Sequence, residues 1–206
     1  MFIGIDFDNT IACYDELFAV AAADHGHVPP GTASTKSQVK QAVLRNPDGE
    51  RHWMTLQGEV YGARMAGASM MPGLGDFLTA CKERGVPVAI ISHKTIYGHH
   101  DPRRVNLRDA ARGWMHDQGF FDGDGFGIDE RHLYFESTRE EKVHRIGRVG
   151  CTHFIDDLPE VFEEPGFPDG LDAILYDPAG SLSPPAGVRS SADWRSIQNM
   201  VFGGDD

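Results

Sequence analysis

The sequence predicts an α/β fold in which a three-layer, doubly wound parallel sheet carries a small helical insertion. From residue 72 onward, short apolar runs alternate with amphipathic helical segments, and the loops between them are short. This alternation is typical of parallel strands joined by right-handed helical crossovers. Residues 13–71, in contrast, show helical periodicity and no convincing strand. We therefore expect a core domain of residues 1–12 and 72–206 and a helical insertion of residues 13–71.

Composition excludes several classes of partner. The 206 residues have a formal net charge of −12. An acidic surface gains nothing from counterion release and is not drawn to anionic lipid, so we expect neither nucleic acid nor membrane as a partner. Three widely spaced cysteines give no metal-binding pair and no disulfide framework. No signal peptide and no apolar run of membrane-spanning length is recognisable, so we expect a cytoplasmic protein, and the oligomeric state stays open.

The first predicted strand is the apolar run over residues 2–5, which ends in Asp6 and Asp8. Charge at the end of a buried strand is costly unless a cation meets it. Carboxylates are ligands that a hard divalent cation such as Mg²⁺ prefers. One carboxylate could also attack an electrophile while the other carries protons. In an extended chain alternate side chains share a side, so both can flank one ligand.

The remaining elements follow in order along the chain. Within the insertion we expect helices that begin near Tyr14 and cover residues 32–46 and 50–66. The predicted core helices cover residues 74–84, 107–118, 138–149 and 159–164, and the predicted core strands cover residues 86–91, 132–135, 151–155 and 173–176. The remainder from Asp177 is rich in Gly, Pro and Ser, so we expect a loosely packed tail.

Four motifs in this order resemble the haloacid dehalogenase-like (HAD) superfamily of phosphohydrolases, through about residue 176. The motifs are Asp6-Phe7-Asp8-Asn9-Thr10, Ser92 after an apolar strand, Lys142 at the start of a helix, and Asp156-Asp157 after the next strand. All fall at carboxyl ends of strands or at the start of the following helix, where ligands bind in such sheets. The resemblance implies a HAD-like Rossmannoid core, with residues 13–71 as a small helical cap between the first and second motifs.

The resemblance implies a hydrolase with an aspartyl-phosphate intermediate. Asp6 would be the nucleophile, and Asp8 would protonate the leaving group and then activate water. Mg²⁺ would be held by Asp6, the backbone carbonyl of Asp8, and Asp156, with Asp157 acting through water or as an orienting group. Such a cation offsets the repulsion between an anionic nucleophile and an anionic substrate.

The remaining motif residues would bind phosphate. Ser92 and Lys142 would hold phosphate oxygens and stabilise charge in the transition state. His93 follows Ser92 directly and would support it, and Thr10 would fix the first loop. The resemblance implies these roles for Ser92, Lys142 and Thr10, whereas the role of His93 rests on its place next to Ser92.

Two further stretches supply substrate-contacting candidates. Three histidines fall within eight residues after Ser92, but their spacing fits no metal-ligand pattern, so we favour a substrate-facing loop. Arginines in that loop could reach a second anionic group. The candidates from the cap and this loop are Tyr14, Trp53, Tyr61, Arg64, Lys94, His99, His100 and Arg103.

We therefore expect a Mg²⁺-dependent phosphatase that acts on a small phosphomonoester, either a sugar phosphate or a nucleotide. One alternative is a phosphotransferase or mutase with the same intermediate, which needs an acceptor that competes with water. Another is a receiver-like signalling module phosphorylated on Asp, although that fold places its Asp on a later strand. A third is a module that binds phosphate compounds without turnover.

Overall fold

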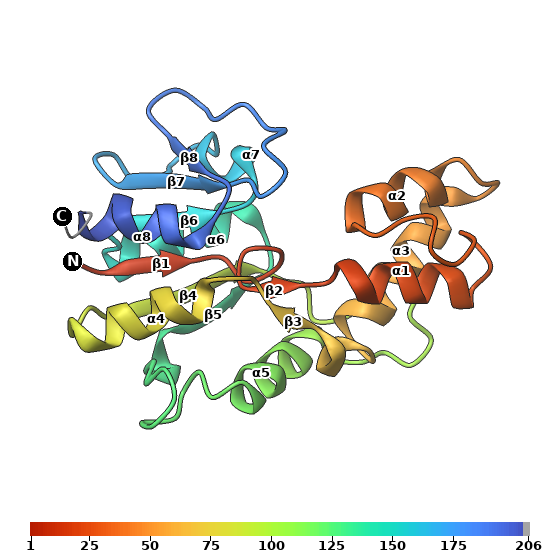
Figure 1. Cartoon of the computed structure of the whole chain (residues 1–206), viewed down its shortest axis with the longest axis horizontal. Coiled ribbons are helices and arrows are strands. Elements are labelled where there is room, and N and C mark those ends of the chain that lie inside the picture. Colours follow the sequence, from red (N-terminus) through yellow and green to blue (C-terminus); the bar gives the residue numbers. More distant parts are fainter. Residues whose placement is uncertain (204–206) are drawn as a thin grey trace. The chain divides into compact units, whose positions relative to one another are not determined.

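The computed structural model describes residues 1–203 and consists of two compact units (Figure 1). The first unit comprises Met1–Ala12, Met70–Lys94 and the chain from Gln118 onward, and the second comprises Cys13–Ser69 and Thr95–Asp117. Residues 95–117, which we expect in the core from the sequence, group with the helical insertion in the structure. Residues 204–206 of the expected core lie outside the described residues. The assignment of residues 13–71 to a substrate-selecting cap stays a prediction.

A six-stranded parallel sheet forms the first unit, which confirms the predicted α/β class. The strands lie in the order β5-β4-β1-β6-β7-β8. Their bounds are β1 (Ile3–Ile5), β4 (Val88–His93), β5 (Leu133–Glu136), β6 (His153–Asp156), β7 (Asp172–Tyr176) and β8 (Arg189–Ser191). β1 is wholly buried between β4 and β6, as its apolar sequence predicts. A side chain at Gly4 would meet the ring of Phe154 at 2.5 Å, so only glycine fits there.

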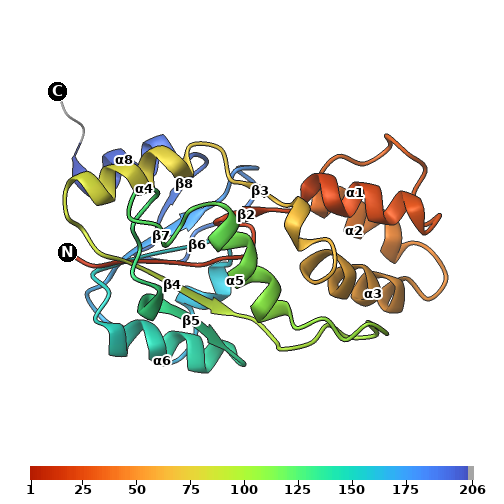
Figure 2. The ribbon, with the colours of Figure 1, turned by 90° about the horizontal axis from the view of Figure 1, so that it is seen from below.

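Helices cover both faces of this sheet and complete the three layers. Figure 2 shows α4 and α8 on one face and α6 on the other. The helices of the first unit are α4 (Leu74–Glu83), η2 (Glu130–His132), α6 (Arg139–Val149), α7 (Pro159–Phe162) and α8 (Trp194–Phe202). The predicted capping box of α6 is confirmed, because Thr138 accepts from the amide of Glu141 and the Glu141 carboxylate accepts from the amide of Thr138.

The expectation of a loosely packed tail after Asp177 is wrong. β8 pairs in parallel with β7 at the edge of the sheet. α8 begins after Asp193, whose side chain accepts from the amide of Ser196. Trp194 and Ile197 are fully buried, and the Trp194 ring lies 5.0 Å from that of Phe77 on α4. The Gly, Pro and Ser residues that suggested a tail are concentrated in the loop before β8, so averaged composition concealed an amphipathic helix.

The second unit is helical, as the sequence predicts for residues 13–71. Its helices are α1 (Asp15–Asp24), α2 (Lys36–Leu44), α3 (Gly49–Tyr61), η1 (Met65–Gly67) and α5 (Leu107–Asp117). The core is aromatic: the ring of Phe18 stacks on that of Trp53 at 4.8 Å, and Tyr14 contacts Tyr61 edge-to-face at 4.9 Å. Such pairs stabilise a helical core beyond the area that they bury.

Residues 95–106 pack against α3, which explains why they group with the second unit. A Cβ atom on Gly98 would lie 2.4 Å from the Cα atom of Gly58, so the two backbones touch where neither residue carries a side chain. The carboxylate of Asp101 accepts from the amides of Arg103 (3.0 Å) and Val105 (3.1 Å). No periodic pattern in the sequence signals this packing, because it depends on two glycines in distant segments.

Two short strands, β2 (Ala12–Cys13) and β3 (Ser69–Met70), pair where the chain leaves the first unit and returns to it. Among residues 1–203, no helix combines the length and the apolar character needed to cross a bilayer.

Candidate active site

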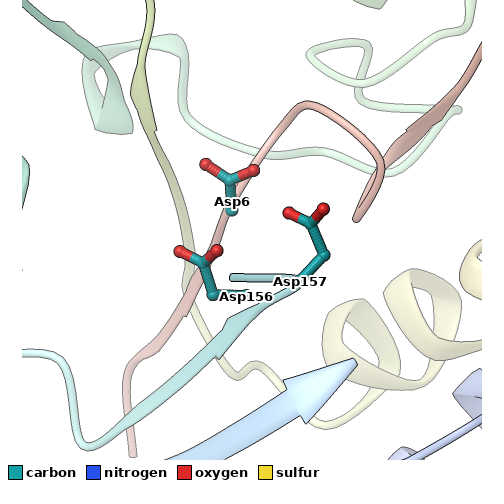
Figure 3. A group of neighbouring side chains, drawn as sticks. All are labelled: Asp6, Asp156 and Asp157. Carbon is teal, nitrogen blue, oxygen red and sulfur yellow. The ribbon is translucent and has the colours of Figure 1, made fainter. Parts of the chain in front are cut away.

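Three carboxylates meet at the carboxyl edge of the central strands. Asp6 follows β1, Asp156 is the last residue of β6, and Asp157 comes next along the chain (Figure 3). Ile5 pairs with Ile155, so the parallel register brings Asp6 beside Asp156. One oxygen from each of Asp6, Asp156 and Asp157, the acidic cluster, lies within 4.8 Å of the others. In the described part of the chain, no other group of three or more His, Cys, Asp or Glu side chains meets this distance.

Lys142 bridges two members of the acidic cluster. Its Nζ atom lies 2.5 Å from Oδ1 of Asp6 and 2.5 Å from Oδ2 of Asp156. The lysine sits in the first turn of α6, directly after the capping box, and its side chain is only 2 % exposed. A buried ammonium is tolerated because it is paired twice, and each carboxylate in turn gains a charge-assisted hydrogen bond.

The buried charges shift one another's pKa values. Burial raises the pKa of Asp6 to about 7; Lys142 opposes this effect, and the carboxylates of Asp156 and Asp8 add to it. Burial by itself would lower the pKa of Lys142, but the carboxylates of Asp156 and Asp6 outweigh it and raise that pKa above its ordinary value. Lys142 therefore stays cationic, while Asp6 needs further positive charge to be fully ionised at neutral pH.

Asp8 forms a second ion pair beside the acidic cluster. The Nζ atom of Lys94 lies 2.8 Å from both carboxylate oxygens of Asp8. Lys94 directly follows β4, and its side chain is 2 % exposed, whereas that of Asp8 is 19 % exposed. Lys94 is a substrate-facing candidate in the sequence, where nothing indicates its contact with Asp8.

The loop between Asp8 and β2 is tied to the acidic cluster. Asn9 has a left-handed backbone, with φ of 63°, and its side-chain amide donates to Oδ2 of Asp157 at 3.2 Å. The hydroxyl of Thr10, which is fully buried, donates to Oδ1 of Asp157 at 3.4 Å. Asn9 is not among the site residues expected from the sequence; its signal there is that asparagine tolerates the left-handed region better than most residues.

The second motif lies on β4, next to β1. Ser92 is 1 % exposed and pairs in register with Phe135 of β5. His93 is exposed, and its Nε2 atom lies 3.0 Å from the carbonyl oxygen of Ser137, just before α6. The His93 ring thus connects the end of β4 to the entry of α6, the helix that carries Lys142.

The predicted cap residues lie in the second unit, and several of them are packed or paired there. Tyr14 (1 % exposed) and Trp53 (6 % exposed) belong to its aromatic core, and Tyr61 contacts Tyr14. Arg64 pairs with Glu59 at 2.7 Å and with Asp24 at 2.8 Å. The remaining candidates, His99, His100 and Arg103, are exposed in the segment that packs against α3.

The donor set fits a divalent cation of the Mg²⁺ type. The three side chains of the acidic cluster offer carboxylate oxygens, which hard cations prefer. The four carboxylates of Asp6, Asp8, Asp156 and Asp157 are accompanied by the ammonium groups of Lys94 and Lys142. With all four carboxylates ionised, these side chains carry a net charge of −2, which one divalent cation would balance.

Comparisons with known proteins identify the fold. No protein-family model matches the sequence, and a search of curated proteins gives no match. Among solved structures, the chain is similar to Protein Tyrosine Kinase A of Mycobacterium tuberculosis, with a TM-score of 0.63, 14% identity, and 98% of each chain covered. It is similar to a HAD hydrolase, family IA, variant 3, from Entamoeba histolytica, with a TM-score of 0.59, 11% identity, and coverage of 95% of this chain and 94% of that one.

A third similar structure is a HAD family hydrolase from Deinococcus radiodurans R1 with bound phosphate and sodium. Its TM-score is 0.52 at 16% identity, with 97% of this chain and 94% of that chain covered. At these identities the similarity is one of fold. The protein therefore has the HAD-like hydrolase fold, as the motifs predict, with an acidic cluster at the end of its central strands.

Proposed function

We propose that the protein is a Mg²⁺-dependent phosphomonoester hydrolase that acts through an aspartyl-phosphate on Asp6. The observation that carries the proposal is the acidic cluster with Lys142 between two of its carboxylates, at the carboxyl edge of a parallel sheet. Anionic ligands bind at this edge in folds of this type. The substrate would be a small phosphorylated metabolite, either a sugar phosphate or a nucleotide, and the setting cytoplasmic.

The reaction has two steps, and each one balances. In the first, a carboxylate oxygen of Asp6 attacks phosphorus, the bond between phosphorus and the ester oxygen breaks, and Asp8 protonates the departing oxygen. In the second, Asp8 takes a proton from water, the water oxygen attacks phosphorus, and the bond to Asp6 breaks to release phosphate. Ser92 and Lys142 would bind the phosphoryl oxygens, where charge develops in the transition state.

Mg²⁺ would be held by Asp6, the backbone carbonyl of Asp8, and Asp156, with Asp157 nearby. Bound there, it would neutralise charge between the anionic nucleophile and the anionic phosphate. The protein's own part is to keep these carboxylates in place: Asn9 and Thr10 hold Asp157, and the amide of Leu158 donates to Oδ1 of Asp156 at 3.0 Å.

The similar structures support phosphate chemistry and keep one alternative open. The Deinococcus radiodurans hydrolase was crystallised with phosphate and sodium, which is consistent with an anion and a cation at a site of this type. The Mycobacterium tuberculosis protein is named a tyrosine kinase, which favours phosphoryl transfer as the second candidate. A transferase or mutase would use the same aspartyl-phosphate and pass the phosphoryl group to an acceptor other than water.

The test is hydrolysis of 4-nitrophenyl phosphate by the wild type and by Asp6→Asn, each with Mg²⁺ and with EDTA. We expect activity that needs both Mg²⁺ and Asp6, and trapping of a phosphorylated protein by rapid acid quench of the wild type only. Asp76→Asn, at an exposed position on α4, is the matched control and keeps full activity.

Two outcomes would contradict the proposal. Turnover that survives in Asp6→Asn would place the nucleophile elsewhere. A folded wild type that binds Mg²⁺ yet turns over neither aryl phosphate nor a panel of sugar phosphates and nucleotides would favour a binding module. Product release that rises when a hydroxyl acceptor is added would favour the transferase.

A further inference from the structure

Two lysines are buried in the first unit, and the proposed chemistry uses only one of them. Lys142 bridges Asp6 and Asp156, whereas Lys94 contacts both oxygens of Asp8 at 2.8 Å. Lys94 is 3 % exposed, which is unusual for a lysine on a strand-end loop. The buried ammonium of Lys94 faces Asp8, the proposed acid–base group, and this position points to a part in the chemistry.

The structure holds Lys94 in place from several sides. Its backbone amide donates to the carbonyl oxygen of Glu136 at 2.9 Å, which extends the pairing of β4 with β5 by one residue. Its Nζ atom also lies 5.3 Å from the centre of the Phe7 ring, within the range of a cation–π contact. The ammonium therefore has a fixed position from which to orient its partner.

Contact with both oxygens restrains the carboxylate of Asp8 more than a single hydrogen bond would. A carboxylate held at one oxygen can still rotate about its terminal bond, which is broad in energy. With Nζ equally close to both oxygens, that rotation breaks a charge-assisted contact. Asp8 keeps 19 % of its side chain exposed, so the fixed carboxylate remains accessible.

We propose that Lys94 is a positioning residue for Asp8, which holds its carboxylate in one orientation for proton transfer; this inference rests on the proposed function. Lys94 acts through Asp8 and leaves the phosphoryl group to Ser92 and Lys142. Positioning matters because small misplacements of a catalytic group cost large factors in rate.

The two steps depend on Asp8 differently, which makes the proposal testable. A nitrophenolate leaves without a proton, so the first step on 4-nitrophenyl phosphate does not need Asp8 as an acid. An alkoxide leaving group does need that proton. The second step needs Asp8 as a base whatever the substrate, because water must lose a proton to attack. Misplacing Asp8 therefore slows the second step for both substrates and the first step for alkyl phosphates only.

The experiment is rapid-quench kinetics on Lys94→Met, which removes the charge and keeps a long side chain. With 4-nitrophenyl phosphate we expect a burst of about one nitrophenolate per active site, followed by a steady rate lower than wild type by roughly 10²-fold, the lower end of general acid–base effects. With an alkyl phosphate, Lys94→Met should give no burst of released alcohol, and the first step should slow by a similar factor. Lys94→Arg, which keeps a buried cation, should recover at least part of the rate.

A control variant tests whether the loss of any hydrogen-bonded lysine in this unit has the same effect. Lys82 also has a structural role, because its Nζ atom donates to the carbonyl oxygens of Gly123 (2.8 Å) and Gly125 (2.6 Å) in the same unit. Lys82→Met should keep the wild-type kcat and the wild-type burst amplitude.

Lys94→Met removes the ammonium beside the Asp8 carboxylate, which could impair folding. A double-mutant cycle with Asp8→Asn avoids this problem, because position 8 then carries no charge. If Lys94 acts through Asp8, adding Lys94→Met to Asp8→Asn changes kcat by less than about 2-fold, since coupled sites are not additive. A large further loss would overturn the proposal. So would a Lys94→Met enzyme with wild-type kcat, or one whose KM rises while kcat is kept, which would place Lys94 on the substrate. If the wild type itself lacks turnover that depends on Asp6 and Mg²⁺, the proposed function fails instead.

Discussion

The two units of the molecule differ in their balance of charged side chains and in whether they bury them. The first unit carries 22 acidic and 10 basic side chains, whereas the second carries nine of each. Among the described residues, every charged side chain that is buried belongs to the first unit: Asp6, Lys94, Lys142, Asp156 and Asp177. The second unit instead buries aromatic rings and keeps its charged groups at least partly exposed.

This difference depends on whether a unit supplies partners for a buried charged group. Parallel strands that end at one edge bring carboxylates and lysines from distant segments together, and each charge finds a partner. In the second unit the helices pack through apolar and aromatic faces, and the charged side chains stay at least partly exposed. The first unit therefore pairs charges in its interior, whereas the second fills its interior with aromatic rings.

The largest expected effect is the loss of Lys142. Lys142→Met leaves Asp6 and Asp156 buried without their shared cation, and breaking a buried pair in this way costs about 3–5 kcal/mol of unfolding free energy. For a chain of this size we expect the melting temperature to fall on the order of 10 °C, measured by thermal unfolding in EDTA.

Lys40 supplies the matched control in the second unit. It is exposed and lies 6.0 Å from the centre of the Trp53 ring, so Lys40→Met should lower the melting temperature by only about 2 °C. Equal losses in both variants would show that buried charge does not distinguish the units.

A change of pH should alter the stability of the two units in opposite directions. Burial raises the pKa of Asp6 to about 7, so the folded state binds its proton more tightly than the unfolded state. The stability from this group is full below pH about 4 and is lost as the pH rises through 7. In the second unit, burial and the neighbouring His52 and His25 lower the pKa of His27. Its stability is present above pH about 6.5 and is lost as the pH falls through the lowered pKa.

Hydrogen exchange read by mass spectrometry can follow each unit separately. In EDTA, peptides of the first unit should exchange faster at pH 8 than at pH 5 after correction for intrinsic rates, and Mg²⁺ should reverse this at pH 8 because it binds the ionised carboxylates. Asp6→Asn should remove the trend, and His27→Gln should remove the smaller, opposite trend in the second unit. A trend that persists in Asp6→Asn would assign it to another group.

The residues of the acidic cluster and the lysine that bridges two of them carry local sequence signals. Asp6 and Asp156 each end a short apolar run, and Lys142 follows a capping box, so each is recognisable within a few residues. The pairing of Lys94 with Asp8 is not local, since 86 positions separate them and only the register of β1 on β4 brings them together. Strand register is set by the whole sheet, so single-sequence patterns do not supply it.

The second unit is harder to predict, and the reason is physical. Its helices follow from periodicity, but the grouping of residues 95–117 with it depends on the backbone contact between Gly58 and Gly98. Trp53 and Tyr14 are substrate-contacting candidates in the sequence, and in the structure both are buried and belong to the aromatic core of the second unit. Aromatic residues serve packing and recognition alike, so their identity alone does not separate the two roles.

Gly98→Ala tests that backbone contact. The new Cβ atom would lie 2.4 Å from the Cα atom of Gly58, and forced overpacking of this kind costs about 1–3 kcal/mol. We expect faster hydrogen exchange in the second unit and unchanged exchange in β1 and β6. Gly113→Ala is the matched control: it lies within α5 with open space around it, so it should stabilise that helix by about 0.5–1 kcal/mol. Equal protection in both variants would mean that residues 95–106 are not anchored on α3.

The smallest effect on stability is expected at Arg103. The same variant tests whether the second unit takes part in substrate selection. Its side chain is exposed, so Arg103→Gln should change the unfolding free energy by no more than about 0.5 kcal/mol. If the segment of residues 95–106, which carries Arg103, contacts the substrate, KM should rise about 10-fold for a phosphomonoester with a second anionic group. This is the effect expected from the loss of one charge-assisted hydrogen bond. KM for 4-nitrophenyl phosphate, which has no such group, should stay the same, as should all KM values of Arg51→Gln on α3. A KM that does not change for any doubly anionic substrate would show that Arg103 takes no part in substrate recognition.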